Sequence, residues 1–468
     1  MKILLISTTI PGGEQAVPDL GLGHIATHLR KGGHTVFLKD FSVERRDLDA
    51  FERYLKDEKF DVVGLKMFSG GLADGRKVTD RIKRALPAAK IIIGGPHPSC
   101  APEHTLEYFA DADYACYGEG ELCLRALADQ LQAGKLDLPA IPSLAFRETE
   151  PDGKTTVRIN HAVQPEDLDE LGWPAWDLIP PKRYASRQTI NILPKEEVIA
   201  PIIASRGCAY ACTFCTGHTI TGKGVRFRSP DSLLDEIEML IRDHGIQEFQ
   251  IMDDNFTFKK SFVFDFCEKM KKRGIKIPWS CPYGIRVMSV TPEMIKAMWD
   301  AGCYYVALGI ESGSDRILDK MNKKLRSGVV SERVQIIKDH SGMNVMGFFI
   351  IGYPTETVEE VEHTIEFAAN LPLDFASFTT LRLTPGMGIL DEVKAEGWTD
   401  FSWETIDTFK LSYHPTTISR EKLNELRKKA YRRFYASPRR IMNILKSATS
   451  RRNLTVLAHL SWRRLFPS

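Results

Sequence analysis

The first 135 residues alternate short apolar runs with amphipathic stretches, a pattern that predicts strands alternating with helices. Strands are expected where apolar residues run together, and helices where they recur every three or four positions. The expected strands are 2–8, 35–39, 61–67, 90–93 and 112–117, and the expected helices are 20–31, 47–56, 73–86 and 121–133. Regular alternation of this kind predicts a parallel, doubly wound α/β sheet.

A second strand–helix series follows a proline-rich stretch. Eight prolines between residues 138 and 195 break any long helix, so this stretch is interpreted as an ordered linker. The second series predicts a partial (β/α)₆ TIM-type barrel, because a full eight-stranded barrel needs about 250 residues and only about 190 are present. Its expected strands are 198–205, 248–252, 279–287, 304–310, 345–351 and 375–383, with helices at 230–243, 260–273 and 356–370.

The expected organisation is therefore a first domain of the Rossmann-like or flavodoxin-like class over 1–137, a linker over 138–195, the partial barrel over 196–390 and a basic helical region over 391–468. Sheets of the first class bind ligands at the carboxyl ends of their strands, and the glycine-rich loops fall at those ends.

Composition excludes a disordered or fibrous chain, because 43% of the 468 residues are hydrophobic and 26% are charged. No apolar run approaches the roughly 18–20 residues of a spanning helix. The opening stretch lacks the features of a signal peptide, so a cytoplasmic protein is expected.

The net charge of +2 conceals a basic tail, since residues 419–468 hold 14 Lys and Arg against two Glu. This tail is interpreted as a helix pair packed across the barrel mouth with a solvated basic face. The alternative is an interfacial helix that meets anionic lipid at the membrane periphery. Nucleic acid is disfavoured, because no recognised binding motif accompanies the charge.

Cys208, Cys212 and Cys215 follow the first strand of the second domain at spacings of four and three. Three thiolates on one loop are able to hold three irons of a [4Fe–4S] cluster, which leaves the fourth iron open for a ligand. The alternative is a zinc site completed by His218. No second cysteine pair is present, and Cys267, Cys281 and Cys303 are interpreted as core thiols.

The cysteine spacing, with Phe214 before the last cysteine, resembles the signature of the radical S-adenosylmethionine (SAM) enzymes. The resemblance implies that SAM binds the open iron and is cleaved to a radical that removes hydrogen from an unactivated carbon. It also implies SAM contacts at the barrel strand ends, namely Phe214, Asp253, Asp254, Arg286, Glu311, Ser312 and Gly352. The structural alternatives are solvated turn residues for the two aspartates and a helix cap for Glu311.

A doubly wound domain ahead of this barrel resembles the cobalamin-binding branch of that family. Glycines at the loop tips let the backbone approach a large ring, although a flavin or a nucleotide would suit the same loops. The Asp-x-His-x-x-Gly motif that supplies a cobalt-ligating histidine is missing, so Met67 and Phe68 are expected near the lower cobalt face. The residues expected at cobalamin are Ser69, Gly70, Gly94, Gly95, His97, Gly118 and Glu119.

The layout is similar to the anaerobic Mg-protoporphyrin IX monomethyl ester cyclase and to hopanoid-modifying members of the branch. The resemblance implies an oxygen-sensitive enzyme that uses a [4Fe–4S] cluster, SAM and cobalamin, with C-methylation as the expected reaction. A small apolar or carboxylate-bearing substrate and an electron donor such as flavodoxin or ferredoxin are expected. The alternatives are oxidative cyclisation or ring rearrangement of a tetrapyrrole or lipid-like substrate, a radical enzyme whose first domain binds no corrinoid, and a non-enzymatic iron–sulfur sensor.

Overall fold

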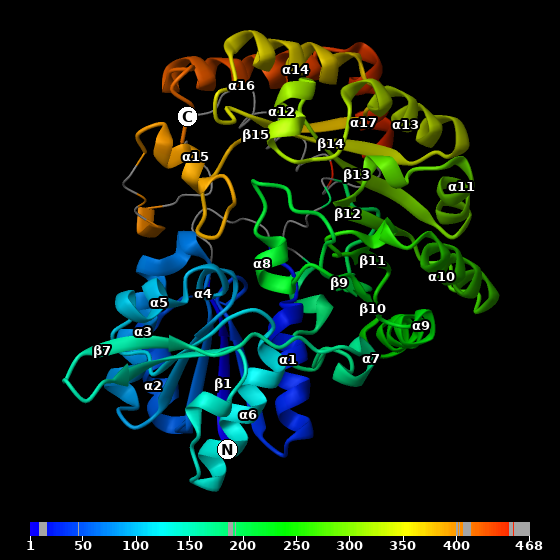
Figure 1. Cartoon of the computed structure of the whole chain (residues 1–468). Coiled ribbons are helices and arrows are strands. Elements are labelled where there is room, and N and C mark those ends of the chain that lie inside the picture. The colour runs from blue at the N-terminus through cyan, green and yellow to red at the C-terminus, as the bar shows by residue number, and fades with distance from the viewer. Residues whose placement is uncertain are drawn as a thin grey trace.

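The computed structural model describes residues 1–8, 16–44, 46–185, 191, 193–398, 401, 403–405, 413–448 and 453. It holds two large sheets, each covered by helices, of which the first is mostly parallel and the second is parallel throughout (Figure 1). The first sheet and its helices occupy the blue and cyan part of the figure, and the second sheet and its helices occupy the green and yellow part. This mixed α/β architecture confirms the predicted fold class.

The first sheet has the strand order β2-β1-β3-β4-β5-β6-β7. Its first five strands are parallel, and the order 2-1-3-4-5 is the flavodoxin-like one, with its topological switch point between β1 and β3. These strands are β1 (Lys2–Ser7), β2 (Thr35–Asp40), β3 (Val62–Lys66), β4 (Lys90–Gly94) and β5 (Tyr114–Cys116).

Helices cover both faces of this sheet and bury a separate apolar core on each. One core involves α1 (Leu20–Lys31) and α6 (Gly120–Ala133), and the other involves α2 (Leu48–Glu58) and α3 (Leu72–Ala85). Local sequence sets the helix starts, because Asp19 and Asp47 accept hydrogen bonds from the first free backbone N–H groups of α1 and α2.

The stretch predicted as a linker adds two strands to the first sheet. Strands β6 (Leu144–Thr149) and β7 (Thr155–Ile159) form a hairpin that pairs antiparallel to β5. The prolines of this stretch argue against a long helix but do not exclude strands. Pro142 and Pro151 lie just outside β6 and β7, where they remove no hydrogen bond between the strands. The first sheet therefore extends beyond residue 137.

The second sheet is parallel throughout and has the order β15-β14-β13-β12-β11-β8. Six strands with outer helices match the predicted partial barrel, and no pairing closes the sheet within the described residues. The strands are β8 (Ile199–Ile202), β11 (Glu248–Ile251), β12 (Trp279–Ile285), β13 (Cys303–Glu311), β14 (Asn344–Ile351) and β15 (Phe375–Thr380). The helices around them are α9 (Pro230–Met239), α10 (Lys260–Lys272), α11 (Pro292–Asp300), α13 (Ser327–His340) and α14 (Val358–Asn370).

The C-terminal helices α16 (Arg420–Tyr435) and α17 (Pro438–Ser447) lie on the outside of the second unit (Figure 1). Helix α16 packs against α14 and β15 rather than across the barrel mouth. Lys429 and Arg433 pair with Glu362 and Glu366 of α14, at 2.6 and 2.7 Å. Two of the seven basic side chains of α16 therefore face acidic neighbours on α14.

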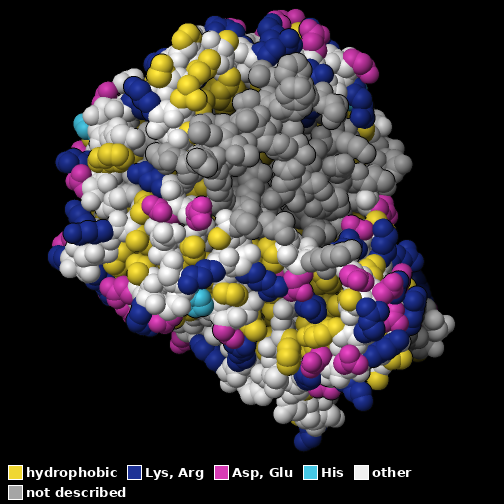
Figure 2. Space-filling model, turned by 180° about the vertical axis from the view of Figure 1, so that it is seen from behind, with side chains coloured by type: hydrophobic (Ala, Val, Ile, Leu, Met, Phe, Trp, Pro, Cys, Tyr) yellow, Lys and Arg dark blue, Asp and Glu magenta, His cyan; other side chains and the backbone are white. Residues whose placement is uncertain are grey.

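The rest of the basic tail, residues 449–452 and 454–468, lies outside the described residues. On the face seen in Figure 2, acidic and basic side chains intermingle over the described surface. Within the described part of the chain, no helix is both long and apolar enough to cross a bilayer.

Candidate functional site

The cysteine loop begins at a point where only glycine fits. Strand β9 (Ser205–Arg206) leads into Gly207, whose φ is +94°. A Cβ atom built on Gly207 would lie 1.9 Å from the carbonyl oxygen of Gly224, so any larger residue would push the two segments apart. The loop then carries the three cysteines and ends at the short helix α8 (Gly217–Thr221).

The three thiols differ in exposure but share this loop. Cys212 is buried, Cys208 is half-buried and Cys215 is exposed, with its sulfur accepting a hydrogen bond from the backbone N–H of Gly217 at 3.3 Å. Partial desolvation by the surrounding loop raises the pKa of Cys208 and Cys215, an effect that bound iron would reverse by favouring thiolate.

Among the described residues, no three histidine, cysteine or carboxylate side chains converge as they would around a single metal ion. Thiolates that each bind a different iron of a cluster need not converge on one ion. A set of three sulfur donors on one loop therefore fits a [4Fe–4S] cluster.

The middle of the cysteine loop is anchored from three distant segments. The N–H of Thr213 donates to the carbonyl of Met321 at 3.1 Å, and its carbonyl accepts from the N–H of Ile389 at 3.0 Å. Its hydroxyl bonds the hydroxyl of Tyr353, and the side-chain amide of Asn322 donates to the carbonyl of Ala211 at 2.9 Å. The loop geometry is thus held by the ends of several barrel elements.

The two adjacent aspartates after β11 differ in burial and in hydrogen-bond partners. Asp253 is buried and accepts hydrogen bonds from the N–H of Ala204 and the hydroxyl of Ser205, both at 2.7 Å. Burial raises the pKa of Asp253 to about 7. Asp253 thus fixes the strand that leads into the cysteine loop, whereas Asp254 is exposed and accepts from the hydroxyl of Thr221 at 3.3 Å.

Glu311 lies at a bulge at the end of β13, in the left-handed conformation with φ +71°. Its carboxylate pairs with the ammonium of Lys323 at 2.7 Å, and both side chains are almost fully buried. The same ammonium lies 5.8 Å from the ring centroid of Phe214 in the cysteine loop. Strained backbone and bulges gather at functional sites, so this pair is a candidate contact for a ligand of the cluster. Sequence reasoning missed Lys323, because no motif marks it.

Arg286, at the end of β12, connects the same segments. Its guanidinium donates to the carbonyl of Lys323 at 2.5 Å and stacks on the ring of Tyr210, 3.4 Å from the ring centroid. Tyr210 lies between the first two cysteines. Arg286 therefore lies beside the cysteine loop.

Ser312 and Gly352 have structural contacts. The hydroxyl of Ser312 is fully buried and bonds that of Thr364 in α14 at 3.2 Å. Gly352 makes a left-handed turn with φ +78°, and a Cβ atom there would lie 2.5 Å from Leu423 of α16. Both residues shape the strand ends: the side chain of Ser312 faces α14, and the Cα atom of Gly352 lies against α16.

The glycine-rich loops of the first sheet lie at its carboxyl edge, as predicted. Gly95 has φ +101°, and a Cβ atom there would lie 2.9 Å from the backbone nitrogen of Met67. Gly94 accepts a hydrogen bond from that N–H at 2.7 Å, and Gly70 forms a tight turn that starts α3. The side chain of Met67 is fully buried beside Gly75 of α3, and Phe68 is half-buried, so their placement near the lower cobalt face stays a prediction.

His97 is fully buried and bonded at both ring nitrogens. Nδ1 lies 2.9 Å from the hydroxyl of Ser69, and Nε2 lies 3.1 Å from Nδ1 of His104. Burial, with His104 adding, lowers the pKa of His97 to about 4, so its ring is neutral. In this arrangement His97 has no free nitrogen to offer a metal and instead joins Ser69 to His104.

Gly118 and Glu119 face the second unit rather than open space. The N–H of Gly118 donates to the hydroxyl of Ser99 at 2.9 Å, and a Cβ atom built on Gly118 would lie 3.6 Å from the carbonyl oxygen of Ile220 in α8. Glu119 is buried and paired with Arg206 and Arg226 of the second unit.

Helix α4 (Pro96–Cys100), which follows β4, packs against α8. The carboxyl edge of the first sheet and the cysteine loop therefore face one another.

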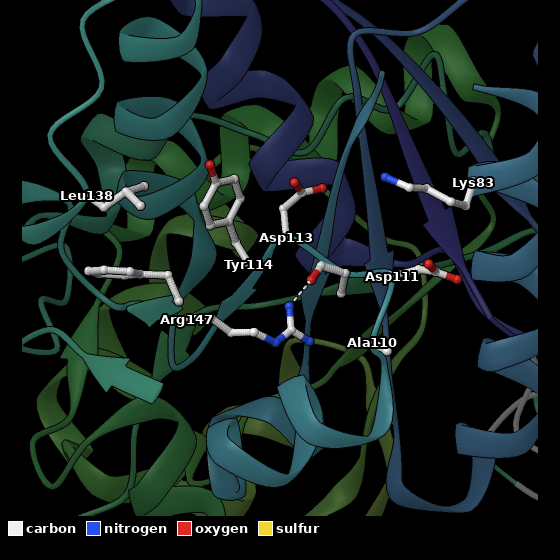
Figure 3. A pocket seen from close by; sticks show the side chains of 9 residues that line it. Lys83, Ala110, Asp111, Asp113, Tyr114, Leu138 and Arg147 are labelled. Atoms are coloured by element: carbon white, nitrogen blue, oxygen red, sulfur yellow. Dashed lines mark hydrogen bonds between the residues drawn. The ribbon is translucent and has the colours of Figure 1, made fainter. Parts of the chain in front are cut away.

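A cavity of about 340 Å³ lies elsewhere, at the amino-terminal edge of β5 (Figure 3). Lys83, Asp113 and Arg147 line it, and the guanidinium of Arg147 already donates to the backbone carbonyls of Ala112 at 2.7 Å and Phe109 at 3.1 Å. This edge is opposite the glycine-rich loops, so the cavity is separate from the candidate site.

Comparison with known proteins gives the same two-part division. Residues 202–368 match the radical SAM superfamily, and residues 13–128 match the B12 binding domain. An uncharacterised methyltransferase of Pyrococcus horikoshii is 31% identical over 94% of this chain and 94% of its own length. The chain belongs to the cobalamin-binding radical SAM enzymes.

Other similar proteins of this family differ in reaction. The cytidylyl-2-hydroxyethylphosphonate methyltransferase of Streptomyces wedmorensis is 28% identical over 85% of this chain and 83% of its own length. The anaerobic magnesium-protoporphyrin IX monomethyl ester cyclase of Rubrivivax gelatinosus is 25% identical over 93% and 77%.

The fold matches a solved structure along nearly its whole length. The radical SAM methyltransferase TsrM from Kitasatospora setae, with cobalamin and a [4Fe–4S] cluster bound, has a TM-score of 0.72 at 18% identity and covers 91% of this chain and 90% of its own. The family matches and the relative that is 31% identical show a radical SAM enzyme whose cofactors are a [4Fe–4S] cluster, SAM and cobalamin, which rules out the non-enzymatic sensor.

Proposed function

We propose that this enzyme methylates an unactivated carbon of a small molecule. The observation that carries the proposal is the arrangement of the two sites, with the cysteine loop opposite the carboxyl edge of the flavodoxin-like sheet. When bound, SAM at the cluster supplies the hydrogen-abstracting radical and cobalamin supplies the methyl group. The methyltransferases among the relatives support this reaction.

In this proposal the protein holds and orients the reactants. Cys208, Cys212 and Cys215 bind the cluster, and the Glu311–Lys323 pair offers a carboxylate and an ammonium to the polar groups of SAM. Phe214 lies within the cysteine loop, and Asp254 and Arg286 lie beside it. The backbone at Gly70, Gly94 and Gly95 faces the corrinoid, and Gly118 lies at the same edge of the sheet, against α8. A further group of residues contacts no cofactor and instead fixes the segments that carry the binding residues. This group comprises Asp253, Ser312, Gly352, Ser69, His97 and Glu119.

The test uses anaerobically reconstituted enzyme. We expect about four irons and one corrinoid per chain, the three sulfur ligands leaving one iron open, with formation of 5′-deoxyadenosine and transfer of a labelled methyl group from SAM to the corrinoid. Cys212→Ala should abolish 5′-deoxyadenosine formation. Cys267→Ala, which removes a buried thiol from α10, is the matched control and should retain it. Nucleoside without corrinoid methylation would contradict methyl transfer.

Oxidative cyclisation is the second candidate, because cyclases from three organisms are similar over 73–93% of this chain. The same assay separates the two reactions. A cyclase should form 5′-deoxyadenosine without moving the labelled methyl group to a product, whereas a methyltransferase should move it.

The finer expectations about partners also belong to the proposal. The substrate is apolar or carboxylate-bearing, and a flavodoxin or ferredoxin supplies the electron. Ile441, Met442 and Leu445 of α17 are about half exposed beside Arg439 and Lys446, which supports peripheral contact with an anionic membrane. Co-sedimentation with anionic vesicles, and its loss on Ile441→Asp, tests this contact.

A further inference from the structure

Two buried carboxylates and two partly buried guanidinium groups join the first unit to the second, and we call them the ionic clamp: Glu119, Glu121, Arg206 and Arg226. The two terminal nitrogens of Arg206 lie 2.7 Å from Glu119 and 2.8 Å from Glu121. Arg226 contacts both carboxylate oxygens of Glu119, one of them at 3.3 Å. The two carboxylate side chains are only 4% and 3% exposed, and the side chains of Arg206 and Arg226 are 10% and 17% exposed, so most of the clamp is shielded from water.

The clamp connects the two loops that matter most for the cofactors. Glu119 and Glu121 lie where β5 ends and α6 begins, at the carboxyl edge of the first sheet. Arg206 lies two residues before Cys208 and is paired in register with Arg226 of β10 (Arg226–Phe227). A single carboxylate, Glu119, thus binds both strands of the ribbon from which the cysteine loop emerges.

Further contacts converge on the same point. Arg226 donates to the carbonyl of Thr221, at the end of α8, at 3.1 Å and to the carbonyl of Pro165 at 2.5 Å. The segment on either side of the cysteine loop is therefore tied to the first unit. His24, which lies near Arg206, adds no charge to the clamp, because burial and the charge of Arg206 lower the pKa of His24 to about 3.

The clamp is better suited to setting geometry than to adding stability. Buried ion pairs often stabilise a fold less than apolar residues of similar size would, because the charges lose their hydration. Forked arginine–carboxylate contacts, in contrast, fix both distance and orientation. The two acidic and two basic groups balance one another, so the clamp leaves no net charge that a cofactor must neutralise.

We propose that Glu119 is a positioning residue that fixes the distance between the iron–sulfur cluster and the corrinoid. This inference rests on the proposed function, in which one substrate carbon is reached first from the cluster side and then from the cobalt. Reactions of positioned groups are sensitive to displacements of about 1 Å. A rigid ionic link between the two cofactor loops meets that requirement. In this inference Glu119 positions the cofactors, whereas the sequence predicts that it binds cobalamin.

The test measures the distance between the cofactors in the holoenzyme. Reduced cluster and cob(II)alamin are both paramagnetic, so their spin–spin interaction in an EPR spectrum reports their separation. Glu119→Gln keeps the side-chain shape and removes the charge. We expect unchanged iron and corrinoid content and loss of the resolved spin–spin splitting. Glu236→Gln, which removes the carboxylate that pairs with Arg228 inside the second unit, should keep the splitting.

The other outcomes are also decisive. A wild-type splitting in Glu119→Gln would overturn the inference. A loss of corrinoid affinity, with unchanged splitting in the molecules that do bind corrinoid, would also overturn it, because Glu119 would then contact the corrinoid itself. If Glu119→Gln does not fold, Arg226→Lys keeps the charge but loses the fork, and unchanged splitting there overturns the inference. Wild-type enzyme that binds no corrinoid would refute the proposed function, and the inference with it.

Discussion

The buried carboxyl of Glu356 should make the stability of the second unit fall as pH rises. One oxygen of Glu356 accepts from the N–H groups of Gly352 and Tyr353, at 2.6 and 3.0 Å, and the other has no partner among the described residues. Burial raises the pKa of Glu356 from 4.5 to about 8. The folded state therefore holds this group neutral at pH 7, whereas the unfolded chain ionises it.

The sign and the size follow from proton linkage. Because the folded pKa exceeds the unfolded one, stability is complete below about pH 4.5 and is lost as pH rises to about 8. Each unit between the two pKa values is worth about 1.4 kcal/mol, which gives about 5 kcal/mol over the whole range.

Glu356→Gln copies the neutral acid at every pH, so it isolates this effect. We expect equal stability of variant and wild type near pH 4.5, and an advantage of the variant that grows by about 1.4 kcal/mol per pH unit up to about pH 8. Urea unfolding followed by tryptophan fluorescence at several pH values measures it. Glu360→Gln, in the first turn of the helix that follows Glu356, is the control. Arg316 holds the pKa of Glu360 at about 2, so the effect of this substitution on stability should be constant above pH 5. An advantage of Glu356→Gln that does not change with pH would refute the reasoning.

Two further substitutions test the candidate site. Lys323→Met leaves the buried carboxylate of Glu311 without its cation. We therefore expect the SAM affinity measured by calorimetry to fall at least about tenfold, with unchanged iron content. Equal SAM affinity in variant and wild type would mean that the Glu311–Lys323 pair does not contact SAM. Gly207→Ala forces a methyl group onto the carbonyl of Gly224 and should reduce bound iron to less than about half, whereas Gly33→Ala, also at positive φ but in open space, should not. Equal iron in both variants would mean that the cysteine loop tolerates the displacement.

Much of this protein is determined by local sequence. Apolar periodicity identifies the parallel strands of both sheets, because burial on a sheet face or a helix face is set by neighbouring residues. The cluster loop is also local, since its three cysteines lie within eight residues. The hairpin β6–β7 was missed because its prolines argued against helix and left strand pairing undetermined.

Tertiary structure alone decided which charged side chains pair with one another. Glu119 lies in a glycine-rich loop that the sequence associates with cobalamin, yet its carboxylate meets arginines 87 and 107 residues away. Lys323 pairs with Glu311 only because the chain beyond α12 (Asp315–Lys320) folds back over the end of β13. The physical reason is common to both: periodicity is set within a few residues, whereas the partner of a buried charge is set by elements that meet only after the whole chain has packed.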